Sequence, residues 1–124
     1  MLSDKNVFLK NKIIEINTAL TIEGSDMFEL IGEVKDLFSS PYNTGTVANC
    51  EVVQELWGAL FNVFSSDSSY DNKFEAIFTM SDIAIYARKQ GVKVGFELLE
   101  EWRSAHGQND TTVEILECID DILL

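Results

Sequence analysis

Side chains that could do chemistry are few in this sequence, and they lie apart. The one histidine, His106, stands between a predicted helix end and Gly107, and a hydroxyl, Ser104, lies two residues before it. A nucleophile–histidine pair needs a base that a third group orients, and this stretch offers no such context. A position just after a helix also favours a protonated imidazole electrostatically. We therefore expect no catalytic role for His106.

Metal-binding patterns are equally weak. Zinc sites need clustered Cys, His or carboxylate ligands, and the sequence contains neither a CxxC nor an HExxH motif. The residues Asp67, Ser69 and Asp71 begin like a calcium loop, but its sixth position is Asn72 instead of Gly and its twelfth is Phe78 instead of Glu. A Gly-rich phosphate loop is also missing. We therefore expect no metal and no cofactor. The segment with Asp67, Ser69 and Asp71 is interpreted as a solvated turn.

The two cysteines, Cys50 and Cys118, lie far apart in the chain. A disulfide between them is possible in principle, but two cysteines at this spacing are not a disulfide framework. Both stand among apolar residues on helical patterns, so the sequence predicts buried free thiols.

Carboxylate pairs, in contrast, are abundant. Glu97 and Glu101 are four residues apart, as are Glu117 and Asp121, and each pair would share one helix face. A hydrolase could use such a pair. A solvated helix face explains the spacing more simply, and we predict that the chain is not an enzyme.

The acidic balance is the most unusual property of the chain. Its 124 residues include 21 Asp and Glu against 9 Lys and Arg, which gives a formal net charge of −12. Such a charge disfavours binding to nucleic acid or to an anionic membrane surface, and it favours fast capture of cationic partners. Apolar residues make up 46% of the sequence, enough for one folded core. We expect a single domain over residues 1–124.

Apolar residues at three- and four-residue steps predict six helices. Their approximate ranges are 4–20, 26–38, 47–64, 72–89, 95–105 and 111–123, with Ser3, Ser25 and Thr111 as N-caps, the last in a capping box with Glu114. The fold class is therefore all-α: a single-domain, irregular bundle of about six helices.

Three details of this arrangement can be tested directly. In the fourth helix, we expect Phe74, Ile77, Phe78 and Ile85 to point into the core. Gly58, inside the third helix, is expected to let a neighbouring helix come close. The segment 92–96 alternates like a short strand but has no second strand to pair with, so we interpret it as the lead-in to the fifth helix.

The negative charge is concentrated near the C-terminus. Residues 95–124 contain one base, Arg103, and eight carboxylates: Glu97, Glu100, Glu101, Asp110, Glu114, Glu117, Asp120 and Asp121. Asp120 and Asp121 fall in the last turn of the final predicted helix, where the helix dipole disfavours acids by roughly 0.3–1 kcal/mol each. Local rules that are broken in one region point to a functional surface. We predict that these eight carboxylates bind a basic surface of a partner protein.

In size, charge and helix content the chain resembles small acidic proteins that oppose basic enzymes, including bacterial immunity proteins of the colicin and contact-dependent inhibition kind. No motif carries this resemblance. It implies a cytoplasmic inhibitor that neutralises a cognate toxin, for example a nuclease, by blocking its basic surface. Three alternatives stay open: a chaperone or adaptor for a secreted or phage protein, an enzyme or small-ligand binder, and an acidic helical surface without a partner.

Overall fold

The computed structural model describes residues 4–22, 26–39, 49–66, 69–106 and 112–123. Within these ranges the chain forms six helices and no strand, which confirms the all-α prediction. The helices are α1 (Asp4–Ala19), α2 (Met27–Ser39), α3 (Cys50–Ser66), α4 (Tyr70–Gln90), α5 (Phe96–Ala105) and α6 (Val113–Leu123). The expected N-caps Ser3, Ser25 and Thr111 lie outside the described residues.

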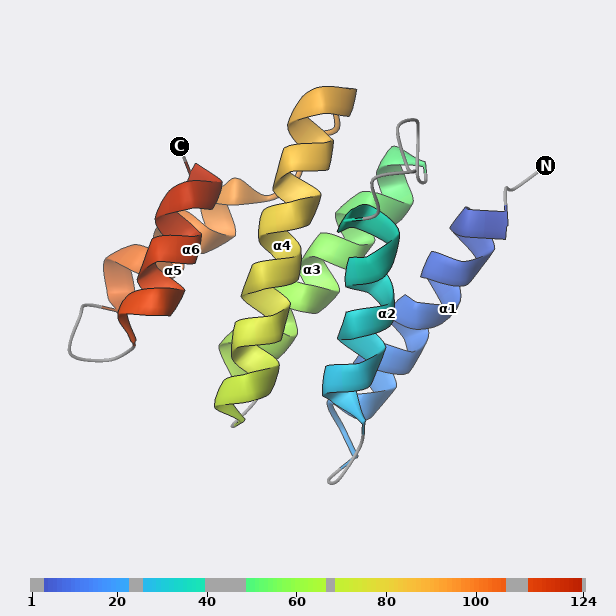
Figure 1. Cartoon of the computed structure of the whole chain (residues 1–124), viewed down its shortest axis with the longest axis horizontal. Helices are drawn as coiled ribbons and strands as arrows, with labels where there is room; N and C mark the ends of the chain where they lie inside the picture. The colour runs from blue at the N-terminus through green and yellow to red at the C-terminus, as the bar shows by residue number, and fades with distance from the viewer. Residues whose placement is uncertain (1–3, 23–25, 40–48, 67–68, 107–111, 124) are drawn as a thin grey trace.

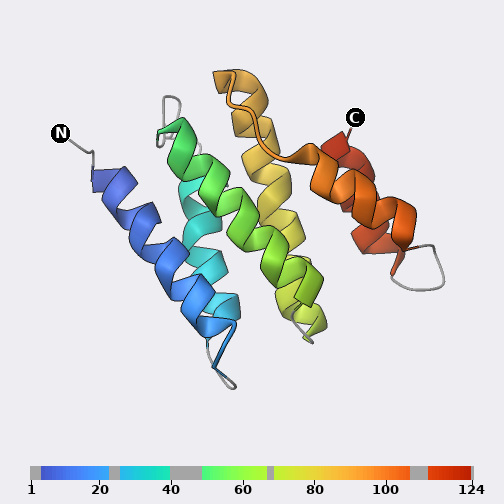
Figure 2. The ribbon, with the colours of Figure 1, turned by 180° about the vertical axis from the view of Figure 1, so that it is seen from behind.

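The six helices are arranged as three antiparallel hairpins in two layers. In Figure 1, α2, α4 and α6 form the front layer, and the view from behind in Figure 2 shows α1, α3 and α5 side by side. Within each hairpin one helix packs on the other, and further contacts join α1 to α3, α2 to α4 and α4 to α6. The bundle is thus a row of hairpins, although the sequence shows no fixed-period repeat.

The central element of this row is α4, which packs against α2, α3 and α6. The core around it contains Trp57 and Phe64 of α3 and Ile77, Met80 and Ile83 of α4, all almost fully buried. Rings from α5 extend this core: Phe96 lies 5.5 Å from Trp57, and Trp102 lies 4.6 Å from Phe64 (ring centroids).

The segment between α4 and α5 is an extended connector, which explains its strand-like alternation. Val92 and Val94 are both buried in the core, whereas Lys93 between them is exposed. Side chains of α3 hold its backbone: Gln54 donates a hydrogen bond to the Lys93 carbonyl (2.7 Å), and the Trp57 indole donates one to the Gly95 carbonyl (3.1 Å). The period of two therefore reports one buried side of a connector and not a sheet.

The helix termini follow the rules of capping, at positions slightly different from those predicted. The hydroxyl of Ser69 accepts the amide hydrogen of Asn72, so α4 begins before residue 72. Thr112 caps α6, because its hydroxyl accepts the amide hydrogen of Ile115 at 3.4 Å. Gly91 ends α4 in the left-handed conformation with φ of 71°.

Two predictions about side-chain placement were wrong. Phe78 and Ile85 are 43% and 52% exposed instead of buried, because α4 is covered on three sides and these residues lie on the fourth. Gly58 does not mediate a close approach, since a Cβ atom added there would meet no heavy atom within 4 Å. Phe74 is half-buried and Ile77 fully buried, in line with the expectation.

Substitution by alanine is expected to change the free energy of unfolding in opposite directions at Gly58 and at Gly91. Gly58→Ala should raise the free energy of unfolding by about 0.5–1 kcal/mol, because alanine restricts the unfolded chain and the site has room for its methyl group. Gly91→Ala should lower it by about 1–2 kcal/mol, because φ of 71° is strained for an L-residue. Urea denaturation of both variants measures the difference. A loss of stability in Gly58→Ala would show that a neighbour does pack against this position.

Candidate functional site

The described carboxylates of the predicted acidic surface are all exposed. They are Glu97, Glu100 and Glu101 on α5, and Glu114, Glu117, Asp120 and Asp121 on α6. The eighth, Asp110, lies outside the described residues. Their exposure follows from the amphipathic pattern of the two helices: α5 buries Leu99 on its inner side, and α6 buries Ile115, Leu116, Ile119 and Ile122.

The structure divides these carboxylates into two groups. Because α5 belongs to the layer of α1 and α3, and α6 to the layer of α2 and α4, the outer sides of the two helices face different directions (Figures 1 and 2). The groups meet where Arg103 of α5 lies 3.3 Å from Asp120 of α6. The predicted surface is thus an α5 group and an α6 group that flank one ion pair.

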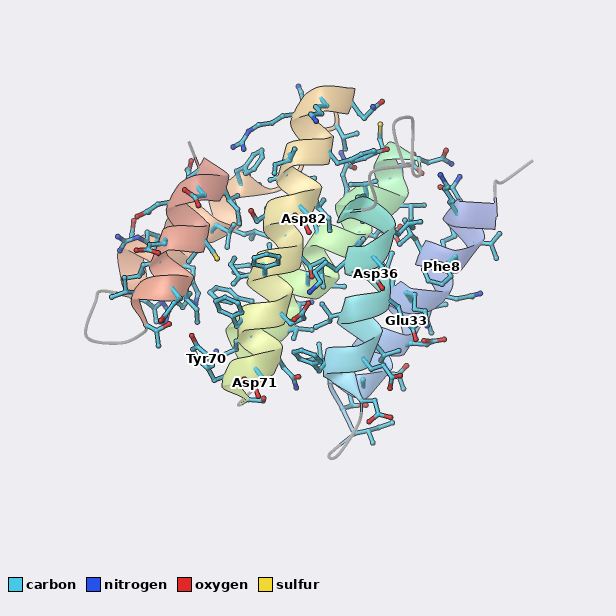
Figure 3. The ribbon with its side chains drawn as sticks, in the orientation of Figure 1. Phe8, Glu33, Asp36, Tyr70, Asp71 and Asp82 are labelled. Carbon is cyan, nitrogen blue, oxygen red and sulfur yellow. The ribbon has the colours of Figure 1, made fainter. Side chains whose placement is uncertain are left out.

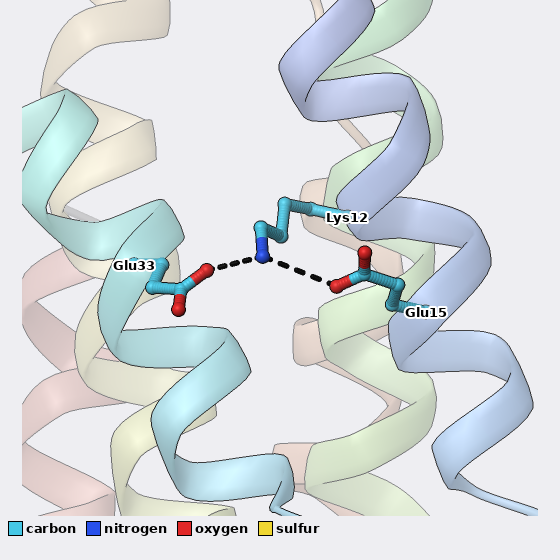
Figure 4. A network of polar contacts seen from close by, with 3 residues as sticks. All are labelled: Lys12, Glu15 and Glu33. Carbon is cyan, nitrogen blue, oxygen red and sulfur yellow. Dashed lines mark hydrogen bonds and ion pairs between the residues drawn. The ribbon is translucent and has the colours of Figure 1, made fainter.

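In the first two hairpins, in contrast, two of the described bases form ion pairs with a carboxylate on a neighbouring helix. Lys12 of α1 forms ion pairs with Glu15 (3.1 Å) and with Glu33 of α2, as Figure 4 shows. The hydrogen bond to Glu33 is the main cause that raises the pKa of Lys12 above its usual value. Within the described part of the α5–α6 hairpin, Arg103–Asp120 is the one ion pair, so six of its carboxylates carry charge that no base neutralises.

A second ion pair joins α2 to α4. Lys35 of α2 forms an ion pair with Glu75 of α4, and its ammonium lies 5.4 Å from the centre of the Phe78 ring. Asp82, one helical turn after Phe78 on α4, is partly buried. This desolvation raises the pKa of its carboxyl above the usual value. Lys35 acts in the opposite direction, lowering this pKa, and Glu75 raises it further.

The negative end of the α6 helix dipole is compensated by a cation from another helix, which the sequence did not reveal. The last turn of α6 contains Asp120 and Asp121 but no base of its own. Arg88, in the last turn of α4, donates a hydrogen bond from its guanidinium to the carbonyl of Ile122. A cation from a neighbouring helix therefore stands at the negative end of α6.

The two thiols are free, as predicted, but the expectation that they are buried was wrong, because neither is fully buried. Cys50 is exposed, because it is the first residue of α3 and lies at the end of the helix. Cys118 is half-buried on α6. Its burial is the main cause that raises the pKa of its thiol, and the negative charges of Asp121 and Glu117 raise it further.

The described residues offer little for catalysis. The ring of His106 stacks on Trp102 (4.2 Å between centroids), and its Nδ1 lies 2.9 Å from the Trp102 carbonyl. Two open depressions border α5, and neither includes His106. No group of three or more potential metal ligands occurs in the part of the chain that the structure describes. The prediction that the chain is not an enzyme stays a prediction.

The structure also reveals a partly exposed row of aromatic rings on α4, of which Phe74 and Phe78 were expected to point into the core. Tyr70, Phe74 and Phe78 are stacked along the outer side of α4, with 6.1 Å between successive ring centroids and interplanar angles of 27° and 26°. The hydroxyl of Tyr70, which is labelled in Figure 3, lies 3.1 Å from the hydroxyl of Thr112, at the start of α6. The four-residue spacing of the three rings was visible in the sequence, but spacing alone does not distinguish a buried from an exposed helix side.

Comparison with known proteins identified no relative: no family model, no curated protein and no solved structure matches the chain. Among the described residues, no helix is both long and apolar enough to cross a membrane.

The thiol of Cys118 reports the electric field of the α6 carboxylates. In a Cys50→Ser background, Asp121→Asn should lower the pKa of Cys118, because it removes a negative charge that disfavours the thiolate. The rate of alkylation by iodoacetamide between pH 7 and pH 9 should therefore rise. Glu114→Gln is the matched control, since Glu114 is not among the causes of the shift. Equal rates in the Asp121→Asn variant and its parent would contradict the assigned cause.

Proposed function

We propose that the chain is an acidic inhibitor that binds a cognate protein and neutralises it by covering a basic surface. An immunity protein that protects a bacterial cytoplasm from a toxin, such as a nuclease, is the concrete form of this proposal. One observation carries it: the α5–α6 hairpin exposes seven carboxylates in its described part, and one base lies among them.

The physical basis is electrostatic complementarity. Exposed carboxylates on one end of a chain with net charge −12 create a negative field that attracts a cationic surface and speeds association. The same field repels nucleic acid and anionic membranes. A basic enzyme site that binds phosphates is therefore the kind of surface that this hairpin can cover.

The α6 group is the better candidate for the contact. The α6 helix is fixed against α4 at both ends, by Tyr70 with Thr112 at its start and by Arg88 with the Ile122 carbonyl at its end. Its carboxylates therefore start from a defined arrangement, and binding loses less conformational entropy. The α5 group lies on the other layer and provides a matched comparison.

A chaperone or adaptor for a secreted or phage protein is the second candidate. The exposed row of Tyr70, Phe74 and Phe78 favours it, because apolar surface next to polar residues is typical of protein interaction sites. Both candidates are protein-binding functions, and they differ in whether charge or apolar contact dominates the affinity.

The test exchanges the two acidic groups separately. One variant carries Glu114→Lys, Glu117→Lys and Asp121→Lys, and the other carries Glu97→Lys, Glu100→Lys and Glu101→Lys, so both change the net charge equally. Tagged wild-type chain and both variants are used to capture proteins from the source cells at low and high salt. We expect a protein with a basic surface that the wild type and the α5 variant retain, and that the α6 variant loses by at least about tenfold in affinity.

Two results would argue against the inhibitor proposal. One is a partner that all three chains bind equally at low salt, which would place the contact elsewhere. The other is binding that stays constant from low to high salt, because a charge-driven contact weakens as salt screens it. The latter result would support the chaperone or adaptor candidate instead.

A further inference from the structure

The outer side of α4 carries a row of apolar side chains, which we name the α4 stripe and define as Tyr70, Phe74, Phe78 and Ile85. Positions 70, 74 and 78 follow a four-residue step and 85 a seven-residue step, so all four lie on one side of the helix. Tyr70 and Phe78 are each 43% exposed, and Ile85 is 52% exposed. This is the side of α4 that α2, α3 and α6 leave uncovered.

The α4 stripe is held in place before any partner binds. Nine residues of α4 between Glu75 and Ala87 are buried, so its backbone is anchored over most of its length. The three rings stack on one another, and Tyr70 is further fixed by its contact with Thr112 of α6. Aromatic side chains that are ordered in advance lose little entropy when a partner covers them, and they are frequent anchors of interfaces.

Negative charge lies on α4 itself and on the two helices, α2 and α6, that flank the stripe. Asp71 and Asp82 lie on α4 itself and Asp36 on the neighbouring α2, as Figure 3 shows. On the other side, α6 exposes Glu114, Glu117 and Asp121.

The bases near the stripe do not cancel this charge. Lys35 is paired with Glu75 and lies over the Phe78 ring, so its charge is already matched. Arg88 and Lys89 follow the stripe at the C-terminal end of α4, where Arg88 donates to the Ile122 carbonyl. The surroundings of the stripe are therefore acidic over most of its length.

We propose that the α4 stripe is the docking site for a cationic amphipathic helix of the partner protein. The stripe runs over four turns of α4, about 22 Å at a rise of about 1.5 Å per residue. A row of apolar side chains on a partner helix, spaced at three and four residues, matches such a straight ridge. Lysine or arginine on either side of that row would face the carboxylates of α2 and α6.

The same charges argue against a second copy of this chain as the occupant. Two copies that met through the α4 stripe would bring carboxylates of α4 and α6 close to their counterparts, with −12 on each chain. Like charges across an interface oppose association. The inference rests on the proposed function, because it assumes a cationic protein partner, and it adds the structural element by which that partner is held.

The test measures binding of a fluorescent peptide of about 18 residues that is built from leucine and lysine, with leucine on one helix side. A second peptide has the same composition but leucines spread around the helix, and a third has glutamate in place of lysine. Fluorescence anisotropy at low and moderate salt gives the affinities. We expect the first peptide to bind at least about tenfold more tightly than either of the others.

Matched variants of the full chain locate the binding site. Phe78→Ser with Ile85→Ser should weaken binding of the first peptide by at least about tenfold. Val7→Ser with Ile14→Ser removes two apolar side chains of α1, in the other layer, that are at least as exposed as Phe78 and Ile85, and should leave the affinity within about twofold. All four positions are more than 40% exposed, so both variants keep the core intact, which circular dichroism verifies.

Three results would overturn the α4 stripe as this docking site. They are equal binding of the first two peptides, unchanged binding by the Phe78/Ile85 variant, and a wild-type dimer that this variant dissociates in analytical ultracentrifugation. The proposed function fails separately. If the α6 charge variant loses the cellular partner but the Phe78/Ile85 variant keeps it, the inhibitor proposal stands and the stripe does not. If the reverse holds, apolar docking stands without charge-driven inhibition.

Discussion

Burial of α4 between α2, α3 and α6 is the constraint on which the other features of this structure depend. A single helix that is packed on three sides joins the N-terminal hairpin to the C-terminal one, so α6 is positioned by α4 and by its own partner α5. The fourth side of α4 is then free by geometry. Its apolar side chains are exposed there because no other described helix covers them, and a helix that is anchored by nine buried residues presents them in a fixed arrangement.

Charge is distributed over this frame in two different ways. In the first two hairpins, Lys12 and Lys35 each bridge two helices through carboxylates, so part of the negative charge is neutralised inside the fold. In the α5–α6 hairpin, most described carboxylates point to solvent and Arg103 pairs with a single one of them. The self-repulsion of a chain at −12 is therefore greatest at one end of the row of hairpins, and a cationic partner would relieve it there.

The two proposals concern the same layer of the molecule, one through its charge and the other through its apolar surface. The α6 carboxylates and the α4 stripe both lie in the layer of α2, α4 and α6, and Tyr70 contacts Thr112 where the two helices meet. In these proposals, long-range attraction by the carboxylates would bring a cationic partner to this layer, whereas short-range apolar contact with the stripe would determine how long it stays. Specificity would then require both a basic and an apolar pattern on the partner.

Helix content, the six segments and the exposed carboxylates were determined by the sequence, because amphipathic periodicity and charge are local properties of the chain. The prediction from the sequence that Phe78 and Ile85 belong to the core was wrong. Periodicity identifies an apolar helix side without saying whether another helix covers it. Tertiary structure alone decided three further points. It separated the α5 carboxylates from those of α6 by placing the helices in different layers, it brought Arg88 to the negative end of α6, and it left the α4 stripe open. Each depends on which helices become neighbours, and that is set by packing of the whole core.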